Sequence, residues 1–214
     1  MKKLDVKQNT PEWLEARRGI VTGSKLKDIM PNSRGGNYVG WYEYVADLLY
    51  QPTGEEIEGE NPMARGHRLE TEAMDLFCSK NNIDRDEIED DGFYLSEDDE
   101  RLGFSPDGVF KSDETQEVEV KCLLPKNHLQ AYLEGGFPSE HKYQVQHAFI
   151  VNKKLEKLHF ILYCPQLPDI SYVSFLIKRE DIAEEIAETI GVLKARLKEA
   201  QEIIKKIKKD NNSF

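Results

Sequence analysis

Two short segments of the chain carry side chains that together suit a metal-dependent hydrolase. Asp107 lies in the turn-like segment SPDG at 105–108, and the strand-like segment QEVEVKC follows at 116–122. Alternate side chains of a β-strand share one face, so Glu117, Glu119 and Lys121 are expected on one face and the intervening valines on the other. If a turn at 111–116 pairs the two segments, Asp107 approaches Glu119.

Two adjacent carboxylates repel each other unless a cation lies between them. Magnesium prefers oxygen ligands, and the backbone carbonyl of Val120 can add one to Asp107 and Glu119. Lys121 is then placed to hold the attacking water or to offset charge in the transition state. Glu70, in the helical segment around RGHRLE, can supply a further carboxylate. These residue types predict a site that cuts phosphodiesters.

Each segment also has an ordinary structural interpretation. An EVEVK pentapeptide is typical of a half-exposed strand with a solvated face, and SPDG is a common turn. The combination of a PD dipeptide with an ExK triplet about a dozen residues later favours the metal site more strongly than either segment does alone.

Composition limits the functional classes. The chain has 214 residues, a net charge of −11, 39% apolar residues and 32% charged residues, as expected of a globular protein. The negative charge argues against non-specific nucleic-acid binding by bulk charge, although a local basic groove is compatible with it. The three cysteines form no CxxC pair, which favours a reduced protein without zinc. With neither a signal peptide nor a membrane-spanning run expected, the protein is predicted to be cytoplasmic.

The periodicity predicts one α/β or α+β domain over 1–214, with a central mixed sheet flanked by helices. Polar and apolar residues alternate from 92 to 121, which predicts consecutive short strands with a turn at 111–116, and two further strands are expected at 157–164 and 171–178. From about residue 180 a long helix is expected, with apolar residues at a heptad-like spacing. Helices are expected at 10–19, 21–30, 38–50, 63–82, 127–135 and 140–152.

The order and spacing of five motifs resemble the phage lambda exonuclease-like recombination nucleases of the PD-(D/E)xK superfamily, which share a restriction-endonuclease-like core. The resemblance extends from about Pro11 to about Ile177. The motifs are WLEARRGIVTGS at 13–24, RGHRLE at 65–70, SPDG at 105–108, EVKC at 119–122 and QVQH at 144–147.

The resemblance implies a role for each matching residue. Asp107, Glu119 and the Val120 carbonyl are implied metal ligands, Lys121 is the implied catalytic lysine, and Glu70 completes the acidic cluster. Gln146 is implied to lie beside the site on its helix. A pocket for a terminal 5′-phosphate is implied for Arg17, Ser24 and Ser105, and Arg34 is implied to contact DNA.

The resemblance further implies a nuclease that uses magnesium, or alternatively manganese, and digests the 5′-phosphorylated strand of linear double-stranded DNA. It would leave 3′ single-stranded tails for phage-type recombination in a bacterial or phage-infected cell. A homotrimeric ring around DNA and a single-strand annealing protein as partner are also implied. Two alternatives stay open: an endonuclease or repair nuclease of the same superfamily, and a DNA-end-binding protein that no longer cuts.

Overall fold

The computed structural model describes residues 1–32, 37, 38, 40, 41, 44, 45, 48, 63–90, 92–123 and 125–211. The strands are β1 (Lys2–Leu4), β2 (Ile88–Glu89), β3 (Phe93–Leu95), β4 (Gly103–Phe104), β5 (Gly108–Phe110), β6 (Gln116–Cys122), β7 (Lys157–Tyr163) and β8 (Tyr172–Lys178). The α-helices with defined bounds are α1 (Pro11–Ala16), α2 (Gly23–Ile29), α4 (Met63–Asn81), α5 (Pro125–Glu134), α6 (Lys142–Val151) and α7 (Ala183–Asn211).

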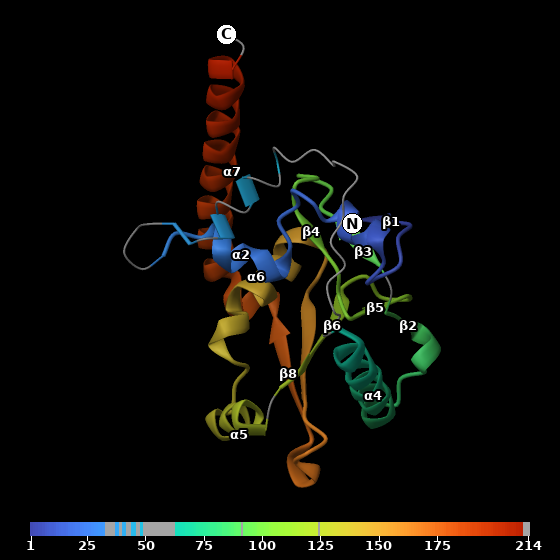
Figure 1. The fold of residues 1–214 in the computed structure, drawn as a ribbon. Coiled ribbons are helices and arrows are strands. Elements are labelled where there is room, and N and C mark those ends of the chain that lie inside the picture. Colours follow the sequence, from blue (N-terminus) through green and yellow to red (C-terminus); the bar gives the residue numbers. More distant parts are fainter. Residues whose placement is uncertain are drawn as a thin grey trace.

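The largest sheet has the strand order β2–β5–β6–β7–β8 (Figure 1). Strands β6 and β7 pair in parallel, and the other pairs in this sheet are antiparallel. A parallel pair needs a long crossover connection, and here it contains α5 and α6. The mixed sheet flanked by helices confirms the fold class that the sequence predicts.

The strands expected at 92–121 do not form one continuous meander. Strands β3 and β4 join β1 in a separate three-stranded sheet, whereas β5 and β6 belong to the large sheet. Pro106 follows β4 and has no backbone N–H to donate, so the chain leaves the small sheet before β5 begins. This crossing places Ser105 and Asp107 between the two sheets, at the start of β5.

The alternation along β6 separates an apolar face from a polar one. Val118 and Val120 pack with residues of α4, in a cluster that also contains Ile161 of β7. Glu119 lies opposite Phe160 in the parallel register, on the other face of the sheet, where α6 and α7 pack. Figure 1 shows α4 on one side of the sheet and α6 on the other. The acidic side chains of β6 are therefore enclosed between the sheet and α6.

The long C-terminal helix expected from the sequence begins at Ala183, after a 3₁₀ turn. Its apolar seam packs into the core through Ile186, Leu193, Leu197 and Ala200. Its C-terminal end projects past the sheet (Figure 1). None of the described helices, this one included, is both long and apolar enough to cross a membrane.

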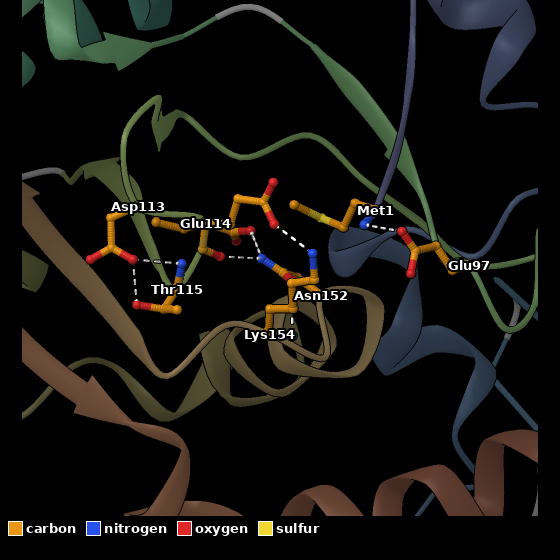
Figure 2. A network of polar contacts seen from close by, with 8 residues as sticks. Met1, Glu97, Asp113, Glu114, Thr115, Asn152 and Lys154 are labelled. Atoms are coloured by element: carbon orange, nitrogen blue, oxygen red, sulfur yellow. Dashed lines mark hydrogen bonds and ion pairs between the residues drawn. The ribbon is translucent and has the colours of Figure 1, made fainter.

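A polar network fixes the end of α6 against the start of β6 (Figure 2). The Asn152 amide donates to the Glu114 carbonyl at 3.1 Å and to the Glu117 carboxylate at 2.8 Å. Lys154 donates to the Glu114 carboxylate at 2.7 Å. Burial raises the pKa of Glu117 to about 7, although the hydrogen bond from Asn152 acts in the opposite direction. These contacts hold β6 in a fixed position relative to α6.

His147 gives the fold a measurable sensitivity to acid. Its Nε2–H donates to the Gly103 carbonyl at 2.9 Å, and burial lowers its pKa from 6.5 to about 4. The neutral ring therefore contributes stability above pH 6.5 that is lost as the pH falls towards 4. His147→Gln keeps a side-chain N–H donor but does not titrate. We expect wild type to lose about 2 kcal/mol relative to His147→Gln between pH 7 and pH 5.

Urea unfolding of both proteins at pH 7, 6 and 5 measures this difference. Glu117 titrates in the same range in both proteins, so its contribution cancels in the comparison. Parallel dependence on pH in the two proteins would contradict the assignment to His147.

Candidate functional site

The hairpin of β5 and β6 brings Asp107 to Glu119. Gly108 lies opposite Val118, so Asp107, immediately before β5, reaches the middle of β6. The Val120 backbone N–H donates to Asp107 Oδ2 at 2.7 Å. The Glu119 side chain is 3% exposed and that of Asp107 is 19% exposed, so both carboxylates lie largely out of solvent.

The ammonium group of Lys121 lies among the oxygen atoms that the sequence predicts as metal ligands. It donates to Glu119 Oε1 and, at 3.0 Å, to the Val120 carbonyl. The distance from Lys121 Nζ to Asp107 Oδ2 is 4.0 Å. A positive charge is thus held where these three oxygen-bearing groups converge.

The charges of these groups are strongly coupled. Burial, reinforced by the neighbouring Asp107 carboxylate, raises the pKa of Glu119 to about 8. Burial alone would lower the pKa of Lys121, but the charges of Glu119 and Asp107 outweigh it and raise that pKa above its ordinary value. Two carboxylates at this depth require a cation beside them.

The oxygen atoms present fit a divalent cation. Glu119 Oε2 is buried and has no hydrogen-bond partner, and buried carboxylate oxygens of this kind are the ligands that magnesium prefers. No three His, Cys, Asp or Glu side chains gather into a metal-binding group within the described part of the chain. The Val120 carbonyl, which shares the Lys121 ammonium with Glu119, would be a third protein oxygen for a metal held by Asp107 and Glu119.

Glu70 of α4 borders the same cluster. Burial raises the pKa values of Glu119 and Cys122, and the negative charge of Glu70 adds to both increases. Glu70 and Asp107 also line a small cavity of about 20 Å³, together with Gln8, Thr71, Met74 and Asp90. A cavity of this size holds about one water molecule, so Glu70 is placed to act on a water or ion beside the cluster.

The glutamine beside the cluster is Gln144, and the structure does not bring Gln146 to it. The Gln144 amide donates to Glu119 Oε1. Gln146 is 2% exposed and accepts a hydrogen bond from Thr189 of α7 at 2.8 Å. Residues two apart in a helix point about 200° apart, so only one of the two glutamines can face the sheet. The sequence QVQH shows both residues but not which one faces β6.

Arg17 and Ser105 meet beside this cluster. Arg17 Nη1 donates to Ser105 Oγ at 3.2 Å, and the guanidinium lies 4.0 Å from the centre of the Trp13 ring. Burial lowers the pKa of Arg17 to about 10, and the Glu119 charge acts in the opposite direction. Arg17 is therefore a largely buried cation whose charge interacts with the carboxylate of Glu119.

Ser24 lies at the edge of the same region but not in contact with Arg17 or Ser105. It is exposed in the first turn of α2, and its Oγ is 3.3 Å from that of Thr22, the residue that precedes the helix as its N-cap. A Cβ at Gly23 would stand 3.1 Å from Gln144 Cγ, so the start of α2 borders the acidic cluster. The predicted DNA contact Arg34 lies outside the described residues.

Comparison with known proteins gives consistent results. Residues 12–154 match the family described as the YqaJ-like viral recombinase domain. An alkaline exonuclease (LHK-Exo) from Laribacter hongkongensis has 25% sequence identity and a TM-score of 0.78, over 95% of this chain and 99% of that chain. The structure of LHK-Exo in complex with dAMP has the same sequence identity, TM-score and coverage. No curated protein matches.

A phage related exonuclease from Haemophilus somnus 129PT has 15% identity and a TM-score of 0.54, over 88% of this chain and 96% of that chain. At that identity the similarity concerns the fold alone. Together with the family match, these similarities confirm the resemblance to lambda exonuclease-like nucleases that the sequence motifs indicate.

The position of Lys121 predicts competition between its ammonium group and a metal ion. Lys121→Met leaves Glu119 and Asp107 without their cation, so we expect a loss of about 3–5 kcal/mol in the free energy of unfolding without metal. Magnesium should then stabilise Lys121→Met more than it stabilises wild type, because the variant has no ammonium group that competes with the metal for the oxygen atoms. Thermal unfolding with and without magnesium measures both effects.

Lys154→Met is the matched control, since Lys154 pairs with Glu114 on the surface, away from the cluster. We expect this variant to gain the same stability from magnesium as wild type does. An equal gain in Lys121→Met and wild type would contradict the competition.

Proposed function

The chain belongs to the YqaJ-like viral recombinase family, and from this premise we propose that it is a magnesium-dependent 5′-to-3′ exonuclease. Family membership and the similarity to an alkaline exonuclease support a nuclease that acts on DNA. The proposed substrate is the 5′-phosphorylated strand of linear double-stranded DNA, and the proposed product is a 3′ single-stranded tail.

The observation that carries the proposal is the convergence of Asp107, Glu119 and the Val120 carbonyl on one cationic position. These groups would hold magnesium, or manganese in its place. A divalent cation bound there supplies positive charge to the phosphate that is cut. Because Asp107 immediately precedes β5 and Glu119 lies in the middle of the paired strand β6, the backbone fixes the spacing of the ligands before any substrate binds.

The other side chains of the cluster have distinct proposed roles. Lys121 carries a full positive charge, and with a metal on the carboxylates its ammonium would donate hydrogen bonds to the attacking water or to a phosphate oxygen. Gln144 holds Glu119 Oε1 through its amide and so fixes the direction of that carboxylate. Glu70 lies where it can orient a water beside Asp107.

The direction of digestion requires recognition of a strand end. A terminal phosphate carries more negative charge than an internal diester, and a buried arginine with hydroxyl neighbours favours the greater charge. Arg17 and Ser105 supply these donors, with Ser105 two residues before Asp107 in the chain, and Ser24 would add its hydroxyl from α2. A 5′-phosphate held there lies next to the position of cleavage.

We place this activity in phage-type recombination, in the cytoplasm of a bacterial or phage-infected cell. A nuclease that leaves 3′ single strands supplies the substrate of a single-strand annealing protein, which is the proposed partner. Linear DNA ends are the proposed site of action.

A homotrimeric ring is the proposed assembly. A chain of net charge −11 offers DNA little positive surface, whereas a ring collects Arg17, Arg34 and Lys126 from several subunits around one duplex. We expect the mass of three subunits by light scattering at micromolar concentration. The mass of a single subunit would contradict the ring.

Digestion of defined DNA substrates tests the function. We expect wild type to digest linear duplex DNA with 5′-phosphate ends in magnesium, to digest 5′-hydroxyl ends more slowly, and to be inactive in chelator. Arg17→Ala should lose the preference between the two ends more than it loses basal cutting. Cleavage of closed circular DNA would favour an endonuclease, and end binding without cleavage would favour an inactive end-binding protein.

Variants of the cluster serve as internal controls for the same assay. Asp107→Ala and Glu119→Ala should abolish cleavage but leave a folded protein, because each removes a repulsive charge together with a ligand. Lys121→Ala should lose ~10²–10³ in rate, and strong activity in this variant would contradict its role. Gln144→Leu should slow cleavage, whereas Gln146→Leu should keep the rate and lose about 1 kcal/mol of stability.

A further inference from the structure

The hydroxyl group of Ser105 receives two hydrogen bonds from groups that can only donate. Trp13 Nε1–H donates to Ser105 Oγ at 3.2 Å, and Arg17 Nη1–H donates to the same oxygen at 3.2 Å. Neither an indole nor a guanidinium has an acceptor atom. The two contacts therefore have a fixed polarity, which does not depend on how hydrogen atoms are assigned.

This arrangement determines what the Ser105 hydroxyl can do for a ligand. A hydroxyl has one proton and two acceptor lone pairs, and Trp13 and Arg17 use both lone pairs. Its proton points away from both partners and is available to a third group. Ser105 is partly exposed, so a ligand can reach it. The hydroxyl is thus a donor towards the ligand and cannot act as an acceptor.

Trp13 also fixes the orientation of Arg17. The guanidinium stacks on the indole ring, with 4.0 Å from its central carbon to the ring centroid. Trp13 is itself 6% exposed and packs in a cluster with Phe93 and Leu95. Its backbone N–H is held by Thr10 Oγ1 at 3.3 Å. A rigid ring therefore holds the plane of the arginine before a ligand arrives.

We propose that Trp13 is a positioning residue that makes the Arg17–Ser105 pair donate hydrogen bonds only. Such a pair selects a phosphate dianion, which has only acceptor oxygens at neutral pH, over a 5′-hydroxyl end. The inference rests on the proposed 5′-phosphate recognition and adds the residue that sets its selectivity. Trp13 acts through Ser105 and Arg17 and does not touch the reacting atoms.

Trp13→Phe tests this role, because phenylalanine keeps a ring for the packing and the stack but has no N–H. The measured quantity is the ratio of initial rates on 5′-phosphate and 5′-hydroxyl ends. Loss of one neutral hydrogen bond corresponds to about a fivefold change, so we expect the ratio to fall about fivefold.

Trp41→Phe is the matched control. Trp41, the second tryptophan of the chain, is 1% exposed and has Arg196 stacked 3.7 Å from its ring centroid. It donates no hydrogen bond to Ser105, so its replacement should leave the ratio unchanged. An equal fall in both variants would overturn the inference, because the effect would then be one of general packing.

A double-mutant cycle with Ser105→Ala separates positioning from structural support. If Trp13 acts through the Ser105 hydroxyl, Trp13→Phe should change the ratio by less than about twofold in the Ser105→Ala background. A fivefold fall in that background would overturn the inference. If wild type itself shows no preference for 5′-phosphate, the proposed recognition is wrong; if wild type shows it and Trp13→Phe retains it, the inference alone is wrong.

A fluorescence measurement keeps the inference testable if Trp13→Phe does not fold. In Trp41→Phe, Trp13 is the remaining tryptophan, and titration with inorganic phosphate should change its emission in a saturable way. The change should disappear when Ser105→Ala is added. Emission that does not respond to phosphate, or responds equally without Ser105, would overturn the inference.

Discussion

The placement of two carboxylates in a nearly dry interior is the constraint on which the rest of the structure depends. Asp107 and Glu119 repel each other, and burial increases the cost of charging Glu119. The ammonium of Lys121 offsets that cost from the same strand, and the Gln144 amide adds a neutral donor. The β5–β6 hairpin, the start of α6 and the parallel neighbour β7 all serve to hold these four groups together.

Both faces of the sheet contribute to the hydrophobic core, and the face towards α6 also carries the acidic cluster. The face towards α4 contains Val118, Val120 and Ile161 in an apolar cluster. The opposite face carries the acidic residues of β6 under α6, with the Asn152 network at one end and Gln144 at the other. Both ends of the polar row are anchored to α6, and the same helix packs into the core through Val145, Ala148 and Phe149, so a shift of α6 would disturb the cluster and the core together.

Strand periodicity and motif spacing predicted the central features. The alternation in EVEVK placed Glu119 and Lys121 on one face, and the PD dipeptide placed Asp107 beside them. The rotation of α6 about its own axis was not predictable from the sequence. Gln144 and Gln146 are chemically identical, and packing against the sheet decides which of them faces β6. The split of residues 92–121 between two sheets was missed, since strand signals do not specify partners. Nor did the sequence indicate Trp13, whose role depends on the position of a single N–H.

The contact of Lys121 with Glu119 and the Val120 carbonyl has a consequence for the proposed metal site. A competitor tied to the same strand has an effective concentration that dilution cannot lower. The free metal concentration needed to fill the proposed site would therefore depend on the tethered ammonium of Lys121 as well as on the ligands. The occupancy of the proposed site would then vary with the free metal concentration around the protein, and Lys121 would help to set the concentration at which half of the sites are filled.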